Sequence, residues 1–140
     1  MNDILRPFHL AFPVNNIEET SLWYTKNLFC TVGRRDDKWV DFNFFGHQIS
    51  AHLSYDDNKS FSNSVDEHQV PVRHFGMILT QKQWDKLADN LKDNNIEFII
   101  KPYTRFKGKT GEQSTMFIKD PSGNALEFKA FKNDEMIFEN

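Results

Sequence analysis

The chain has 140 residues, with 17 basic and 20 acidic side chains and a formal net charge of −3 at pH 7. Hydrophobic residues make up 39% of it and aromatic residues 14%, which excludes an intrinsically disordered protein and favours a folded core. The weakly acidic balance offers no basic surface for nucleic acid. We therefore expect one globular domain over 1–140 with no nucleic-acid partner.

The N-terminal stretch and the cysteine content point to the cytoplasm. Cys30 is the single cysteine of the sequence, so no intrachain disulfide can form, which fits a reducing compartment. The first residues carry no signal-peptide pattern, and no apolar run approaches the roughly 20 residues of a membrane span. A cytoplasmic protein without a membrane partner is expected.

The first half of the chain predicts one module, over 5–55. A short apolar strand over 8–14 is followed by a helix over 17–28, which begins after Asn15 or Asn16 and turns Leu22, Trp23 and Tyr24 toward a core. Three further strands are predicted, over 31–35, 39–45 and 48–54. The order of elements is βαβββ.

The second half repeats this order after a polar stretch, 56–72, which is expected to be a linker. The second module, over 73–132, has a strand, a helix over 81–94 and further strands, and a tail follows at 133–140. His9 and His74 stand 65 residues apart, as do Leu22 and Leu87. We predict an α+β fold in which two βαβββ modules form an open, cup-shaped, eight-stranded mixed sheet.

Glu127 is the first candidate functional residue. It lies between Leu126 and Phe128 in the last predicted strand, and a buried carboxylate is rare unless it is paired or binds a metal. His9 and His74 occupy the first strand of each module. Two histidines and one carboxylate suit Fe(II), which keeps open positions for a bidentate substrate and O₂, and they equally allow Zn(II) or Mn(II). The competing interpretation is a buried ion pair between Glu127 and a Lys or Arg.

Three segments resemble the vicinal oxygen chelate superfamily, which contains glyoxalases, bleomycin and fosfomycin resistance proteins, and extradiol dioxygenases. They are the strand around His9, the run His74-Phe75-Gly76, and the segment 120–127, read DPSGNALE. The segments 41–48 and 105–108 are similar to a small subgroup of predicted extradiol dioxygenases. The resemblance implies that His9, His74 and Glu127 hold the metal.

His47 and His52 are the candidate catalytic residues. In extradiol enzymes a histidine near this place moves protons, work suited to a group with a pKa near 6.5. Glyoxalases carry a fourth ligand, a carboxylate, close to the position of His52, so a histidine there is either a fourth metal ligand or a base. Strand parity puts His47 and His52 on opposite faces unless a bulge intervenes, so both remain candidates. His68, in the polar stretch, is expected to be solvated.

The substrate side of the site is less determined by the sequence. Phe117 stands where larger extradiol enzymes place a tyrosine that helps to hold substrate, which leaves Tyr103, Tyr24 or Tyr55 as substitutes. Aromatic side chains are expected either to line a pocket or to fill the core: Trp39, Phe42, Phe44 and Phe106. The basic segment 105–111 is either a lid that meets an anionic substrate or a solvated hairpin tip.

The expected function is Fe(II)-dependent extradiol cleavage of a catechol-like, small aromatic substrate. A second interpretation is a glyoxalase-like lyase or isomerase, or a thiol transferase, that uses Zn(II) or Ni(II) as a Lewis acid. A third is a module that sequesters a small molecule without a metal. Homodimers are common in the family that the chain resembles, and a homodimer is an expected assembly here.

Overall fold

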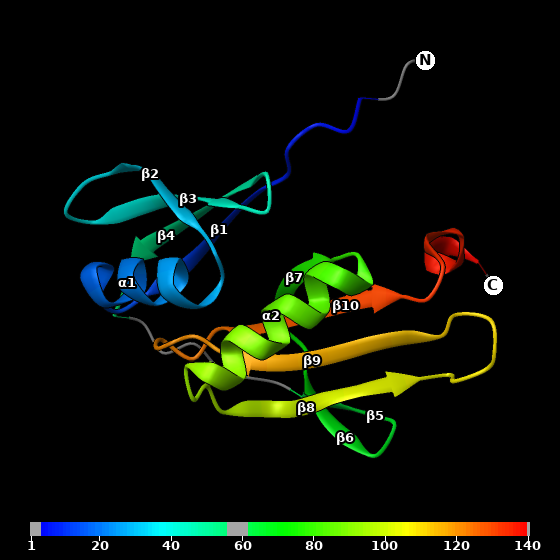
Figure 1. Cartoon of the computed structure of the whole chain (residues 1–140). Coiled ribbons are helices and arrows are strands. Elements are labelled where there is room, and N and C mark those ends of the chain that lie inside the picture. The colour runs from blue at the N-terminus through cyan, green and yellow to red at the C-terminus, as the bar shows by residue number, and fades with distance from the viewer. Residues whose placement is uncertain (1–3, 56–61, 140) are drawn as a thin grey trace. The chain divides into compact units, whose positions relative to one another are not determined.

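The computed structural model describes residues 4–55 and 62–139 and divides into two compact units, Met1–Asn58 and Lys59–Asn140 (Figure 1). Each unit contains one four-stranded sheet. The predicted α+β class with two βαβββ modules is confirmed. In the described part of the chain, no helix is long and apolar enough to cross a membrane.

The first unit follows the predicted order of elements. It contains β1 (His9–Val14), α1 (Ile17–Asn27), β2 (Thr31–Arg35), β3 (Trp39–Phe44) and β4 (His47–Leu53). The strands lie in the order β1-β4-β3-β2, with β1 parallel to β4 and the other neighbours antiparallel. Alternate side chains of the sheet, such as Val14, Phe42 and Ile49, are buried, and the intervening side chains form the other face.

The predicted inward face of α1 is wrong at Leu22, which is 63% exposed. The Asn16 side chain caps the helix by accepting from the backbone N–H of Glu19 at 2.8 Å, and this start turns Tyr24 inward, where it stacks on Phe42 at 5.0 Å. Thr80 caps the second helix, 64 residues after Asn16, whereas the histidines are 65 residues apart. The strand spacing therefore does not carry over to the helices, and Leu22 is not the counterpart of Leu87.

The second unit contains the second module, a two-stranded hairpin before it and a short helix after it. The module consists of β7 (His74–Ile78), α2 (Gln81–Asp93), β8 (Phe98–Arg105), β9 (Gln113–Lys119) and β10 (Ala125–Phe131), with the strands in the order β7-β10-β9-β8. The register of β8 on β9 shifts twice. The tail forms a short 3-10 helix, η1 (Asp134–Phe138).

The stretch expected to be a linker contains a hairpin, β5 (Ser62–Val65) and β6 (His68–Pro71). Residues 56–61 of that stretch lie outside the described residues. Asp66 and Glu67 form the two-residue turn, and both have positive φ, 49° and 66°, as the primed hairpin turns require. The sequence does not predict these two strands, because their side chains are mostly polar. Each strand is also too short to show an alternation of apolar and polar residues.

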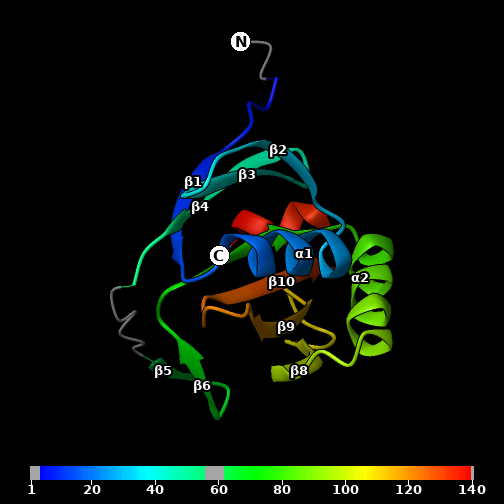
Figure 2. The same cartoon turned by 90° about the vertical axis from the view of Figure 1, so that its left-hand side faces the viewer.

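The helix α2 covers one face of the second sheet. Thr80 and Gln83 form a capping box at its start, and Leu87 and Leu91 are fully buried. The indole N–H of Trp84 donates to the carbonyl oxygen of Phe128 at 2.9 Å, which ties the helix to β10. Figure 2 shows α2 and the β5–β6 hairpin on opposite sides of this sheet. We call the face of the second sheet away from α2 the site face.

Candidate metal centre

Glu127 lies in the middle of β10, on the site face, and is 9% exposed. Its neighbours across the sheet are Gly76 on β7 and Phe117 on β9. A Cβ atom added at Gly76 would lie 1.5 Å from the carbonyl oxygen of Glu127, far inside van der Waals contact. Only glycine allows β7 to pair this closely with β10, which brings His74, two residues earlier, beside the carboxylate.

The His74 ring faces Glu127. Its Nε2 atom lies 3.3 Å from Oε1 of Glu127, and its Nδ1 atom lies 2.6 Å from the carbonyl oxygen of Pro71. A carbonyl oxygen only accepts, so Nδ1 carries a proton, and Nε2 of the neutral ring is then an acceptor. Two acceptors face each other at 3.3 Å unless a proton or a metal cation lies between them.

The carboxylate of Glu127 has two further partners. Thr115 donates its hydroxyl to Oε2 at 2.6 Å, and Nζ of Lys129 lies 3.8 Å from Oε1. Burial would raise the pKa of Glu127, but the hydrogen bonds from His74 and Thr115 and the Lys129 charge outweigh it, so the pKa is lowered. The pKa of His74 is raised, chiefly by its hydrogen bond to Glu127, against a smaller opposing effect of burial.

The pair fits two ligands of one divalent metal. Two donors at about 2.1 Å from one ion, in tetrahedral or octahedral geometry, lie about 3.0–3.4 Å from each other, which matches the 3.3 Å separation. The Pro71 carbonyl and the Thr115 hydroxyl hold the ring and the carboxylate in place, as outer partners of metal ligands do. Within residues 4–55 and 62–139, no third His, Cys, Asp or Glu joins them to complete a ligand group.

The first unit presents His9 with the same protonation pattern. Nδ1 of His9 lies 2.8 Å from the amide oxygen of Gln48, so Nδ1 carries the proton and Nε2 is the acceptor. His9 is exposed and lies on the sheet face away from the buried side chains of the first unit. Its role as the third ligand remains a prediction.

The two candidate catalytic histidines lie on opposite faces of the first sheet. β3 and β4 pair residue for residue without a shift, so His52 shares the face of His9, and His47 has the parity of the buried Ile49. Nδ1 of His47 accepts from the backbone N–H of Phe8 at 2.7 Å. At the start of β4, both His9 and His47 line an open hollow of about 540 Å³.

The strand registers identify the first-module position that corresponds to Glu127. His9 pairs with Gln48 and His74 pairs with Ala125, so two residues further along, Ser50 corresponds to Glu127. Ser50 donates its hydroxyl to Oδ1 of Asp41 at 2.5 Å. The equivalent of Glu127 is therefore a hydroxyl that is already bonded, and His52 lies two positions beyond it, at the equivalent of Lys129.

Sequence reasoning missed the residues that hold His74 and Glu127 in place. Thr115 could have been found, because its hydroxyl side chain comes shortly before the segment 120–127, which ends in Glu127, and the strands on either side of that turn pair with each other. The Pro71 carbonyl could not, because a backbone acceptor leaves no sequence signal. His68, expected to be solvated, is half-buried on β6, and its ring lies 5.1 Å from the ring of Tyr103.

Metal binding is expected to release protons near neutral pH. The pKa of His74 is raised above its usual 6.5, so part of the metal-free protein carries a protonated ring, and a metal ligand must be neutral. Proton release should therefore increase, and affinity should fall, as the pH is lowered from about 8 to about 6. Calorimetric titration of the metal in buffers of different ionisation enthalpy measures this. Release that does not change with pH would contradict the assignment of His74 as a ligand.

Residues 6–128 match the family model described as the Glyoxalase/Bleomycin resistance protein/Dioxygenase superfamily. Among solved structures, the chain is similar to a glyoxalase/bleomycin resistance protein/dioxygenase from Alicyclobacillus acidocaldarius. The two share 33% sequence identity over 99% of this chain and 100% of that chain, with a TM-score of 0.82.

Two more distant structures share the fold. One is the genomically encoded fosfomycin resistance protein FosX from Listeria monocytogenes, with 14% identity and a TM-score of 0.66 over 96% of this chain and 98% of that chain. The other is a lactoylglutathione lyase from Agrobacterium tumefaciens, with 13% identity and a TM-score of 0.66 over 93% of this chain and 96% of that chain.

Proposed function

Because the chain belongs to the glyoxalase/bleomycin resistance protein/dioxygenase superfamily, we propose that it is a metal-dependent enzyme that cleaves a catechol with O₂ in the extradiol manner. The observation that carries this proposal is the facing pair of His74 Nε2 and Glu127 Oε1, 3.3 Å apart on the site face. Their adjacent acceptors, held from outside by Pro71 and Thr115, favour a cation between them.

The number of protein ligands separates the dioxygenase from a glyoxalase with four protein ligands. The first-module equivalent of Glu127 is Ser50, bonded to Asp41, so a fourth carboxylate ligand of the glyoxalase kind has no counterpart there. With His9 as the predicted third ligand, the set would be two histidines and one carboxylate, which suits Fe(II) with open positions. Bound Fe(II) would supply sites for both diol oxygens and for O₂ and would pass electron density between them.

The chain's own residues account for positioning and proton transfer. Thr115 and Pro71 fix the carboxylate and the imidazole, so the ligand atoms need little rearrangement. His52, on the same face of its sheet as His9, is the candidate base for the catechol proton, and His47 is the second candidate. Among the tyrosines named above, Tyr24 is fully buried, whereas Tyr103 lies on the site face.

Anaerobic purification, metal analysis and oxygen uptake with a panel of catechols test the proposal. We expect about one Fe per chain, and O₂ consumption that matches the appearance of ring-opened product, since both oxygen atoms enter the product as the bond beside the diol breaks. Tightly held Zn or Ni without O₂ uptake would indicate the lyase or isomerase instead. Absence of binding under any metal-loading condition would leave the sequestering module.

A further inference from the structure

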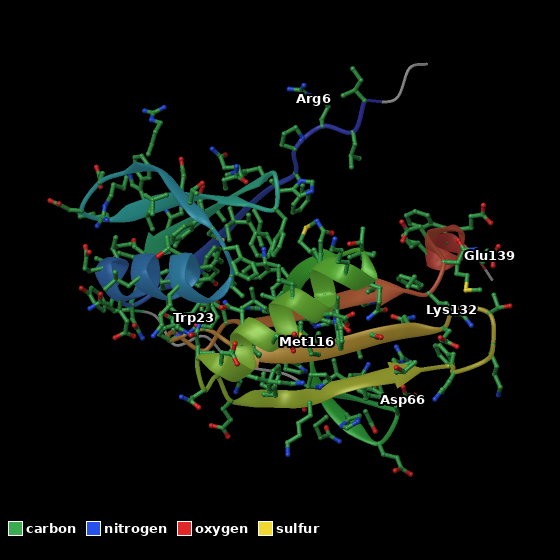
Figure 3. All side chains as sticks on the ribbon, in the orientation of Figure 1. Arg6, Trp23, Asp66, Met116, Lys132 and Glu139 are labelled. Carbon is green, nitrogen blue, oxygen red and sulfur yellow. The ribbon has the colours of Figure 1, made fainter. Side chains whose placement is uncertain are left out.

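A second group of polar side chains lies on the site face, outside the candidate metal centre. Arg105 and Tyr103 of β8 together hold the carboxylate of Asp66. Nε of Arg105 lies 2.5 Å from Oδ2 of Asp66, and the Tyr103 hydroxyl donates to the same oxygen at 3.2 Å. We call Arg105 and Tyr103 the Arg105 cradle. Asp66 comes from the turn of the β5–β6 hairpin, within the stretch expected to be a linker (Figure 3).

The register places the cradle on the same face as Glu127. Tyr103 pairs with Thr115, which donates to Glu127, and Arg105 pairs with Gln113, so these side chains leave the sheet on one side. β8 lies two strands from β10, about 10 Å across the sheet. Along the strands, Tyr103 is level with Lys129 and Arg105 with Phe131, two and four residues beyond Glu127. The Tyr103 end of the cradle is therefore the end that a ring bound at Glu127 approaches with a short acidic side chain.

The two residues of the cradle belong to the second four-stranded sheet, whereas Asp66, whose carboxylate they hold, does not. The Arg105 side chain is 20% exposed and its guanidinium lies 4.7 Å from the centre of the Phe106 ring, and the His68 ring packs on Tyr103. The Asp66 side chain is 39% exposed and belongs to a two-residue turn of a separate two-stranded sheet. The Asp66 carboxylate thus binds to the Arg105 cradle from a separate hairpin, in the position that the carboxylate of a bound molecule would take.

The site face carries two cations, each paired with a carboxylate. Lys129 projects from the same face as Glu127 and is partly exposed, and Arg105 adds a second cation two strands away. The carboxylate of Asp66 is the ionic partner of Arg105, and the Arg105 hydrogen bond lowers the pKa of Asp66, so the partner stays charged at neutral pH. An incoming carboxylate would therefore replace one anion by another and leave the arginine paired throughout.

We propose that the Arg105 cradle binds a carboxylate of the substrate in exchange for Asp66, so that the enzyme prefers catechols that carry a short acidic side chain. This inference rests on the proposed function for the catechol half of the substrate only. The carboxylate half is independent of the metal, because the cradle contains none of the candidate ligands. Arg105 and Tyr103 are then specificity-determining residues, and Asp66 is an internal competitor.

The first test measures the binding of phenylacetate to the metal-free protein by calorimetry. Asp66→Asn removes the competing charge and should tighten binding several-fold, whereas Arg105→Gln should abolish it. Arg105→Lys keeps the charge but loses the planar donor edge and should give an intermediate Kd. The matched control is Arg35→Gln, which removes a guanidinium that is ion-paired to Glu18 at 2.8 Å in the first unit and should leave the Kd unchanged. Equal Kd values for wild type and Arg105→Gln would overturn the proposal.

The second test compares turnover of dihydroxyphenylacetate and of unsubstituted catechol. Arg105→Gln should lower kcat/KM for the acid on the order of 100-fold, mainly through KM, and change it less than about threefold for catechol. An equal loss for both compounds would show a structural role and overturn the proposal. If turnover is absent but phenylacetate binding depends on Arg105, the carboxylate site stands and the proposed function fails. If turnover occurs without any preference for the acid, the proposed function stands and the carboxylate site fails.

Discussion

Replacement of Glu127 by glutamine is expected to lower metal affinity by at least about 100-fold, more than the loss of an outer partner does. Glutamine keeps the size of the side chain and an oxygen that can accept from Thr115, but it loses the negative charge. His74→Ala should have the same effect, since it removes the second acceptor at 3.3 Å. Elemental analysis of protein purified and loaded anaerobically, together with titration of the metal-free variants, measures both losses.

Glu112→Gln is the matched control for this change. Glu112 is also a largely buried carboxylate of the second unit. It has a lysine nearby, since Nζ of Lys132 lies 3.9 Å from Oε1 of Glu112. It also accepts from the backbone N–H of Gly108 at 2.6 Å, so its replacement removes comparable contacts away from His74. We expect Glu112→Gln to leave metal content unchanged. A loss of thermal stability that both variants share then results from replacing a buried carboxylate. Loss of metal in Glu127→Gln alone shows that Glu127 is a metal ligand.

The competing interpretation makes a different prediction from the same variants. If Glu127 served only as the partner of Lys129, 3.8 Å away, Glu127→Gln would lower thermal stability and leave metal content as it was. Lys129→Met would then lower stability as well, but by less, because Glu127 keeps its hydrogen bond from Thr115. Metal retention in Glu127→Gln would contradict the metal centre. His9→Ala extends the series to the first unit, and loss of metal in that variant would identify the third ligand.

The predictable part of this molecule follows from backbone periodicity. Alternating apolar and polar side chains around Val14, Phe42 and Leu126 predict strands without knowledge of the strands that pair with them. The capping residue Asn16 predicts the start of the first helix. Parity was also enough to put His47 and His52 on opposite faces, as the unshifted pairing of β3 and β4 confirms. The burial of Glu127 followed from its apolar neighbours.

The parts that sequence reasoning missed depend on register or on contacts between polar groups. Ser50, rather than His52, is the counterpart of Glu127, and this follows only from knowing which residues pair between β1 and β4 and between β7 and β10. The hairpin with Asp66 at its turn has no apolar alternation, and Arg105 and Tyr103 stabilise its turn from β8. Such ion pairs join residues far apart in the chain and leave no local signal.

Replacement of Gly76 by alanine is expected to be the most destabilising small change in the second sheet. The new Cβ would lie 1.5 Å from the carbonyl oxygen of Glu127, so β7 would have to move away from β10. Overpacking of this kind costs on the order of 3 kcal/mol or more. We expect the thermal midpoint to fall by roughly 10 °C, and metal affinity to fall with it, since β7 carries His74. Thermal denaturation of the metal-free protein measures the first effect.

Gly33→Ala supplies the matched control, because it makes the same change in a strand of the first sheet. There the nearest atom to an added Cβ is the Asp41 carbonyl oxygen at 3.5 Å, an ordinary contact, and we expect a change within about 1 kcal/mol. The register counterpart of Gly76 in the first module is Ala11, which already carries a Cβ, so the restriction at Gly76 comes from the approach of Glu127 and not from the fold as such. A Gly76→Ala protein as stable as Gly33→Ala would mean that β7 can separate from β10 at little cost. The separation of His74 from Glu127 would then be adjustable, and the fit of the pair to a metal would lose its geometric basis.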